Sequence, residues 1–385
     1  MLTRLMSQAI SLVALLSVGL VGCAKGEDKP PPAYAKDWGG PLPGLSPSQL
    51  AQFKRGRATF ARLFTPQTGL GPLFNDNSCR ACHHHGASGG HSERVSLLFG
   101  AMYKGGPSLL EQFGGPMLQE RSVSGHPFEQ VPREATSLSQ RMSPAVWGLG
   151  LVEAIPASEI LGQMAPNELR RTLGIRGIAN WEQGQIGRFG MKSQKATMQT
   201  MTSQAFSWQM GIATPRQLEE PRPNLLPARL SAGEISQAAV DDVVTYQRLL
   251  GAPPRGSVDM DVRSGQRIFS KVGCIQCHSS ALQTGPNEFG VPVGLTVPAY
   301  SDFLLHVMDE SLADHMVQGA ATGQMWRTAP LWGLRLRKRY LHDGRATTLR
   351  DAIQLHGGEA TAVVRAFQSL SSAEKSSIER FLNSL

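Results

Sequence analysis

The sequence CRACH at residues 79–83 recurs as CIQCH at residues 274–278. In each copy two cysteines lie three positions apart, on one side of a helical turn, and a histidine directly follows the second cysteine. With this spacing both sulfur atoms can reach the two vinyl groups along one edge of a porphyrin, while the histidine lies beneath the iron. We therefore expect two covalently bound haem c groups. The attachment residues are Cys79, Cys82, Cys274 and Cys277, and the iron ligands are His83 and His278.

A zinc site and a thioredoxin-like dithiol are the alternatives for these cysteine pairs. Neither explains why each pair has its own adjacent histidine, and an isolated dithiol does not explain the duplication. Three histidines follow Cys82 in a row, and successive residues of a helical turn are rotated by about 100°. If His83 faces the iron, His84 and His85 point away from it, so we expect these two to be exposed beside the haem edge.

Short segments on either side of the two motifs are also repeated. G-x-x-x-F precedes each motif, at residues 56–60 and 265–269. RMSPAVWGL at residues 141–149 and RTAPLWGL at residues 327–334 follow them. The order of these elements is the same in both parts of the chain, which favours an internal duplication.

A third repeated element is a helix start. LSAGE at residues 230–234 and LSSAE at residues 370–374 each place a serine where it can cap a helix and a glutamate three residues later. Three elements in the same order indicate two copies of one haem domain. Trp147 and Trp332, one in each copy, are expected to be core aromatics rather than electron relays.

The expected fold is mainly α, with two cytochrome-c-like haem domains at residues 46–252 and 253–385. The boundary lies at residues 246–257, where Gly and Pro end a helix. The distance between the second and third repeated elements is about twice as long in the first copy. The first domain is therefore expected to carry an inserted, loop-rich subdomain at about residues 159–229.

Residues 1–22 indicate an export signal. Arg4 precedes an apolar run that is too short for a transmembrane helix and is typical of a signal peptide. The run ends in LVGC, which resembles the bacterial lipobox and implies cleavage before Cys23 and lipidation of its thiol; a chance cysteine is the alternative. Residues 23–45 are expected to be a Pro/Gly-rich tether. Ala24 resembles the residue found in lipoproteins of the outer membrane that face the periplasm.

The chain carries a formal net charge of +8 at pH 7 and five cysteines. A basic protein favours an acidic redox partner protein or an anionic surface, and nucleic acid is not expected as a partner in the periplasm. No segment after the N-terminus is long and apolar enough to span a bilayer, so we expect the membrane to be reached through the lipid anchor. The motifs and the lipobox use every cysteine, which leaves none for a disulfide.

These motifs together resemble the bacterial di-haem oxidoreductase family, sometimes labelled thiol oxidoreductase. The resemblance rests on the paired C-x-x-C-H sites, the two WGL segments, GRFGMK with QAFSWQMGI, and YLHDGRATTLRDAIQLHGGEA at residues 340–360, and it covers most of residues 46–385. Broader relatives are the di-haem cytochrome c peroxidases and the di-haem enzymes that oxidise protein tryptophans. No free cysteine remains for thiol chemistry, so the thiol label is not adopted.

In those peroxidases a segment like residues 340–360 ends in the sixth ligand of the second haem, usually methionine. The resemblance places His356 at this position. An iron bound by His278 and His356 has a lower potential than a His/Met iron, which departs from the standard peroxidase. Alternatively, His356 is a surface histidine at a helix end. The rival ligands are then Met308, Met316 and Met325.

The first haem has no recognisable sixth ligand. His126, Met142 and an empty coordination position are the alternatives, and peroxide chemistry needs an empty position. Peroxide cleavage also needs a group that moves a proton between the two oxygens. GLGLVEAIP resembles the peroxidase stretch that leads to the catalytic glutamate, so Glu153 is the candidate, with an ion pair within a turn as the alternative. The resemblance also implies that His342 holds its loop against the haem edge.

We therefore expect a di-haem c-type oxidoreductase of the cell envelope with peroxidase-like chemistry. One haem would activate hydrogen peroxide or oxidise a partner, and the other would relay electrons. The alternative is a non-enzymatic di-haem electron-transfer cytochrome, in which both irons are six-coordinate.

Overall fold

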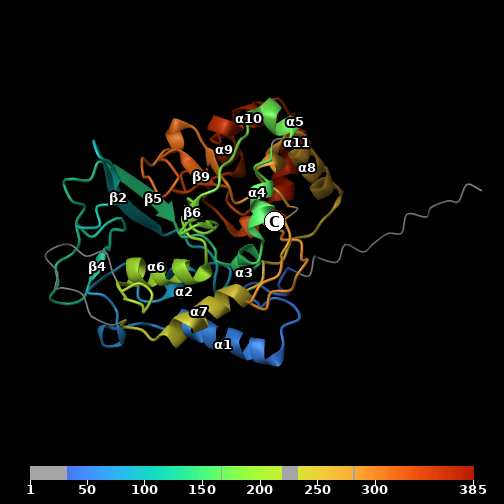
Figure 1. The fold of residues 1–385 in the computed structure, drawn as a ribbon. Helices are drawn as coiled ribbons and strands as arrows, with labels where there is room; N and C mark the ends of the chain where they lie inside the picture. The colour runs from blue at the N-terminus through green and yellow to red at the C-terminus, as the bar shows by residue number, and fades with distance from the viewer. Residues whose placement is uncertain (1–32, 166, 219–232, 281) are drawn as a thin grey trace, which may run out of the picture.

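The computed structural model describes residues 33–165, 167–218, 233–280 and 282–385 (Figure 1). The expected signal peptide, Cys23 and the first part of the expected tether lie outside these residues. Of the described residues, 34% are helical and 15% are in strands, so the expectation of a helix-rich fold is confirmed. None of the helices in the described ranges is long and apolar enough to cross a membrane.

The first of two helix pairs is formed by α1, Pro47–Ala61, and α7, Gln237–Leu249. Ser46 caps α1 by accepting a backbone N–H of the first turn. The two helices pack closely at Gly56, where a Cβ atom would lie 2.0 Å from the carbonyl oxygen of Asp242. The glycine of the first G-x-x-x-F motif is therefore required by helix packing.

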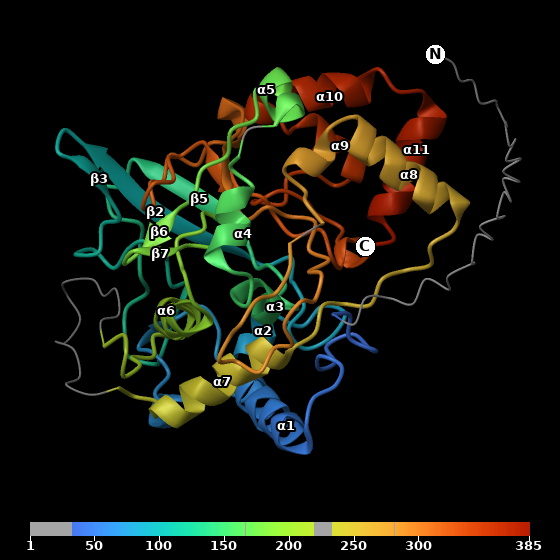
Figure 2. The same cartoon turned by 45° about the vertical axis from the view of Figure 1, so that its right-hand side comes forward.

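The second pair, α8 at Met260–Lys271 and α11 at Ser372–Leu382, repeats this packing. A Cβ atom on Gly265 would lie 1.9 Å from the carbonyl oxygen of Ser377. The capping box predicted at the start of α11 is present, with Ser371 as the N-cap, so this prediction is confirmed. The two pairs lie at opposite ends of the molecule in both views (Figures 1 and 2).

The start of α7 differs from the prediction. The pattern placed a helix start within residues 230–234, but the helix begins at Gln237 with Ser236 as its N-cap. The predicted cap Ser231 lies outside the described residues, and the Glu234 carboxylate accepts the backbone N–H of Ala213 at 2.8 Å. A contact with a distant segment has overridden the local capping signal.

The remaining elements are short, apart from one sheet that the sequence did not predict. The sheet has the order β3-β2-β5, with antiparallel neighbours, and contains β2 (Val95–Tyr103), β3 (Gly106–Ser108) and β5 (Ser137–Met142). The short helices are α2 (Cys79–Cys82), α3 (Leu149–Glu153), α4 (Ala157–Gly162), α5 (Glu168–Leu173), α9 (Leu349–Gln354) and α10 (Thr361–Gln368). Three two-stranded ladders pair β1 (Leu73–Phe74) with β4 (Arg121–Ser122), β6 (Trp181–Glu182) with β7 (Gln185–Ile186), and β8 (Leu305–Val307) with β9 (Met325–Arg327).

The described part of the expected insertion contains more helix than the sequence suggested. Its α6, Met198–Met210, packs on α7. A buried ion cluster fixes the insertion to the rest of the chain: Lys192 Nζ lies 3.0 Å and Arg141 Nη2 lies 2.8 Å from the carboxylate of Asp314. Because these side chains are at most 8% exposed, each charge requires an opposite charge beside it to offset the loss of hydration. The cluster joins both copies and the insertion.

The two WGL segments pack against each other in the largest hydrophobic core. A Cβ atom on Gly148 would lie 2.7 Å from the Trp332 ring, and one on Gly333 would lie 3.1 Å from the Trp147 ring. Both glycines have a positive φ, 69° and 72°, which other residues rarely adopt. Trp147 is fully buried and Trp332 is 6% exposed, so both are core aromatics, as expected.

Candidate haem sites

The first motif forms α2, and Ser78 caps this helix by accepting the Ala81 N–H. His83 follows the helix, and its Nδ1 lies 2.8 Å from the carbonyl oxygen of Pro144, which is in the first RMSP segment. An Nδ1–H that donates to this carbonyl leaves Nε2 as the atom with a free lone pair. Burial lowers the pKa of His83, although the carbonyls of Pro144 and Gly90 oppose this shift. The side chain is therefore a neutral imidazole, the form that binds iron.

The second motif repeats this arrangement. Nδ1 of His278 lies 2.8 Å from the carbonyl oxygen of Tyr300, and burial lowers the pKa of His278 to about 4. The ring centroids of Phe269 and His278 are 6.2 Å apart, and those of Phe60 and His83 are also 6.2 Å apart. The phenylalanine of each G-x-x-x-F motif therefore lies beside the histidine of its own C-x-x-C-H motif.

The four motif cysteines are free and half-buried. Burial raises the pKa of Cys79 and of Cys274 to about 12. A reactive dithiol requires thiolates at neutral pH. The burial of Cys79 and Cys274 therefore does not favour the dithiol alternative.

A cluster beside the second motif was not predicted from the sequence. Ligand atoms of Cys277, Asp302 and His306 lie within 4.8 Å of one another. His306 is held between Asp302 Oδ2, at 3.0 Å, and Glu359 Oε2, at 2.8 Å. Burial opposes its protonation, but the two carboxylates hold the pKa of His306 well above its ordinary value. His306 and the two carboxylates form a hydrogen-bonded network next to the Cys277 sulfur.

His356 lies opposite His278. Their ring centroids are 6.5 Å apart, with an angle of 59° between the planes. Two imidazoles on one metal have centroids about 6 Å apart, because each metal–nitrogen bond is about 2 Å long and each nitrogen lies about 1 Å from its ring centroid. Nδ1 of His356 lies 2.6 Å from the Ala352 carbonyl oxygen, which again leaves Nε2 free. The residues present fit an iron between these two histidines.

Met316, one of the methionines considered as rival ligands, is buried for a structural reason. Met316 is 2% exposed and packs with Leu98 and Met117, and a Cβ atom on Gly100 would lie 2.9 Å from its sulfur. This apolar cluster, beneath the three-stranded sheet, accounts for the burial of Met316 without a ligand role. His356 therefore fits the ligand position by geometry, while its ligation stays a prediction.

Met142, a candidate sixth ligand of the first haem, is also engaged in packing. Its side chain is buried, and a Cβ atom on Gly344 would lie 2.3 Å from its sulfur. Its backbone N–H donates to the carbonyl oxygen of His342 at 2.8 Å. The His342 ring stacks on Trp326 with centroids 3.8 Å apart. These contacts anchor the HDG loop to the first copy. Such an anchor is what the expected role of His342, holding its loop, requires.

Glu153 is fully engaged in an ion pair. Its Oε2 accepts Arg248 Nε at 2.6 Å, and its Oε1 accepts Arg248 Nη2 at 3.0 Å and the backbone N–H of Met198 at 2.8 Å. The carboxylate joins α3, α6 and α7. A role in moving protons would require the pair with Arg248 to open, and that role stays a prediction.

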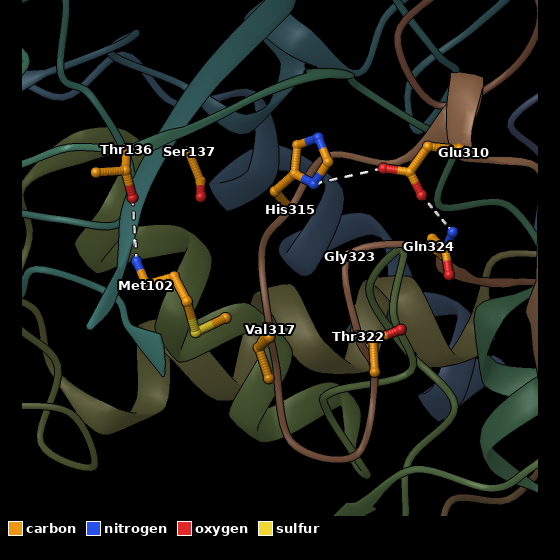
Figure 3. A pocket seen from close by; sticks show the side chains of 9 residues that line it. All are labelled: Met102, Thr136, Ser137, Glu310, His315, Val317, Thr322, Gly323 and Gln324. Atoms are coloured by element: carbon orange, nitrogen blue, oxygen red, sulfur yellow. Dashed lines mark hydrogen bonds and ion pairs between the residues drawn. The ribbon is translucent and has the colours of Figure 1, made fainter. Parts of the chain in front are cut away.

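The described residues also form an open pocket of about 530 Å³ (Figure 3). Its lining residues are Met102, Thr136, Ser137, Glu310, His315, Val317, Thr322, Gly323 and Gln324. In Figure 3 the Glu310 side chain lies between those of His315 and Gln324. No cysteine or histidine of the two C-x-x-C-H motifs lines this pocket, so it is separate from the candidate haem sites.

The chain shares low sequence identity with several solved structures. Hydrazine synthase from Kuenenia stuttgartiensis is 13% identical, over 98% of this chain and 100% of that chain, with a TM-score of 0.43. A MauG-like protein associated with microbial copper homeostasis is 15% identical, over 94% and 95%, with a TM-score of 0.42. The diheme peroxidase BthA from Burkholderia thailandensis is 13% identical, over 88% and 86%, with a TM-score of 0.43. No curated protein matches this chain significantly.

The C-terminal part of the chain matches a family model. The matched residues are 228–385, and the family is described as "Di-haem oxidoreductase, putative peroxidase". This range contains the second C-x-x-C-H motif and His356. A di-haem family implies two haem groups, in agreement with the number of motifs. Residues 228–385 therefore resemble the di-haem oxidoreductase family.

Proposed function

We propose that the protein is a peroxidase-like di-haem c-type oxidoreductase in which the first haem meets hydrogen peroxide or a partner and the second relays electrons. The observation that carries this proposal is the pairing of His278 with His356, at 6.5 Å between ring centroids. Haem supplies a redox-active iron that reacts with peroxide where a coordination position is open. In this proposal the pair closes the second site, which leaves reaction with small molecules to the first.

We align α6, which lies in the expected insertion of the first copy, with α9 of the second copy by their threonine N-caps. Thr348 caps α9, and His356 lies eight residues further on; Thr197 caps α6, and Ala205 lies eight residues further on. Both threonines accept the N–H three residues later. α6 also lies at the first site's core, where Phe206 packs on Phe64 with centroids 5.9 Å apart. Because alanine has no ligating atom, this alignment supports an open first iron.

Covalent attachment through Cys79 and Cys82, and through Cys274 and Cys277, belongs to the same proposal. It is supported by the repeated environment of His83 and His278, each with a backbone carbonyl at Nδ1. The same repetition, with the two glycine-packed helix pairs, supports two cytochrome-c-like haem domains at residues 46–252 and 253–385. The insertion at about 159–229 is proposed to belong to the first of them.

We further propose that the protein works in the periplasm, anchored to the outer membrane through a lipidated Cys23. The support is the apolar segment that ends in LVGC, followed by the Pro/Gly-rich residues 23–45. The formal net charge of +8 favours an acidic redox partner protein. These statements rest on the sequence.

Ligand binding followed by visible spectroscopy tests the division of labour. The holoprotein is first assayed for two haems per chain by the pyridine haemochrome method. Cyanide and peroxide are then added to the ferric protein. We expect half of the haem to respond quickly and half to remain unchanged. A protein with two haems that both ignore cyanide and peroxide would instead be an electron-transfer cytochrome.

A further inference from the structure

Arg255 is a half-buried cation with two unpaired donor atoms. It lies in the segment between α7 and α8, and its Nε and Nη2 atoms are inaccessible to solvent and have no hydrogen-bond partner. Its neighbour Arg335 is different, because Nη2 of Arg335 donates to the carbonyl oxygen of Pro254 at 2.9 Å. Buried guanidinium groups are found with anions or carbonyl groups, since desolvation without compensation is costly. The free donors of Arg255 therefore indicate a missing acceptor.

Aromatic side chains link Arg255 to the second candidate haem site. The Arg255 guanidinium lies over the Phe381 ring, 5.9 Å from its centroid. Phe381 packs in turn on Phe269, at 5.2 Å between centroids, and on Tyr300, at 5.5 Å. Phe269 is the aromatic neighbour of His278. One continuous cluster therefore connects Arg255 with the histidine of the second motif.

Two tyrosines belong to the same site. Tyr34 is 8% exposed and Tyr300 is 4% exposed. Burial raises the pKa of Tyr34 to about 12, and the charge of Arg255 opposes this shift. Tyr300 packs on the Phe381 ring over which Arg255 lies, and Tyr34 forms a β-bridge with Ala252, three residues before Arg255. The guanidinium and the two phenols therefore belong to one region of the structure.

We propose that Arg255, with Tyr34 and Tyr300, forms a carboxylate-binding site that holds a propionate group of the haem bound by His278. This step rests on the proposed function, since it assigns a role toward one of its two haems. Arg suits a buried carboxylate because its planar donors match the two oxygens. The site joins three parts of the chain: Tyr34 in the described part of residues 23–45, Arg255 in the linker between the helix pairs, and Tyr300 in the second copy.

The test measures the reduction potentials of the two haems in the holoprotein by spectroelectrochemistry. The variants are Arg255→Gln, Arg255→Lys and Tyr34→Phe, and the control is Arg267→Gln, which removes an exposed charge from α8. Loss of a half-buried cation favours the ferric iron, so Arg255→Gln should lower the potential of the second haem. The expected change is about tenfold in the equilibrium constant for one-electron reduction, or about 59 mV. Arg255→Lys should keep most of the potential, and Arg267→Gln should leave it unchanged.

A dependence on pH gives a second readout. Without Arg255 the propionate should titrate near neutral pH, so the potential of the second haem should rise as the pH falls from 8 to 6 in Arg255→Gln and stay nearly constant in the parent protein. Tyr34→Phe, which removes only a hydroxyl group, should shift the potential in the same direction by less and covers the case in which Arg255→Gln does not fold.

Three outcomes would overturn this inference. They are an unchanged second-haem potential in Arg255→Gln and Tyr34→Phe, a shift no larger than that of Arg267→Gln, and a shift confined to the first haem. Failure of the proposed function would look different, because the parent protein would then lack two haems in the pyridine haemochrome assay, or both of its haems would ignore cyanide and peroxide.

Discussion

Replacing the two partners of the Glu153–Arg248 ion pair in turn separates a positioning role of Glu153 from a role in proton transfer. The Glu153 side chain is 3% exposed and that of Arg248 is 21% exposed. In Glu153→Gln the amide oxygen still accepts one hydrogen bond, and Arg248 still lies over the Phe289 ring at 3.9 Å. Because one or two charge-assisted hydrogen bonds are lost, we expect the free energy of unfolding to fall by about 2–3 kcal/mol.

Arg248→Gln should cost more. It leaves the nearly inaccessible Glu153 carboxylate without its counter-charge, and breaking a buried pair in this way costs about 3–5 kcal/mol. In the double variant the two losses should not add, and the coupling energy should be about 2 kcal/mol. Urea unfolding of the holoprotein measures all four stabilities.

The rate of reaction with peroxide decides between the two roles. If Glu153, with both oxygens engaged, has only a positioning role, the folded fractions of Glu153→Gln and Arg248→Gln should react with peroxide at the parent rate. General acid–base catalysis typically contributes roughly 100-fold or more. A loss of that size in Glu153→Gln, with Arg248→Gln unaffected, would refute the positioning role and establish the proton-transfer role.

Three further changes test other parts of the structure. Burial raises the pKa of Glu129 from 4.5 to about 8. The contribution of the neutral Glu129 to the stability of the fold is therefore complete below pH 4.5, and it is lost as the pH rises through 8. Glu129→Gln should raise the free energy of unfolding by a few kcal/mol at pH 9 and hardly at pH 4, and urea titrations that find equal effects at the two pH values would contradict this. Lys192→Met should lower the free energy of unfolding by about 3–5 kcal/mol, because Asp314 and the carbonyls of Thr322 and Met325 lose their donor. The control is Lys338→Met at an exposed position, which should change the free energy of unfolding by less than about 0.5 kcal/mol. Cys23→Ser should release the mature protein from membranes, and fractionation that still finds it bound, with no acyl mass shift in the parent protein, would exclude the lipid anchor.

The local features of the candidate sites could be predicted from the sequence because their residues are close together in the chain. The five-residue spacing of C-x-x-C-H determines that His83 and His278 follow directly on their cysteines, and the G-x-x-x-F motif carries both the packing glycine and the ring beside the histidine. His356 came from a family resemblance, and its distance from His278 agrees with that expectation.

The ion pairs could not be predicted, because they join residues that are far apart in the chain. Glu153 meets Arg248, and Lys192 meets Asp314, with no spacing that could signal either contact. The start of α7 was misplaced for the same reason, since Glu234 is bound by the backbone of Ala213. β2 was missed because VSLLFGAMY is buried along most of its length and lacks the alternation that marks a half-exposed strand.

Low-temperature electron paramagnetic resonance of the ferric protein tests the division of labour between the two irons most directly. We predict a low-spin bis-histidine signal that His356→Ala abolishes, beside a high-spin or exchangeable signal that survives the substitution. Peroxide should alter the surviving signal first. Two low-spin signals that ignore both peroxide and cyanide, or a bis-histidine signal that persists in His356→Ala, would contradict the proposal.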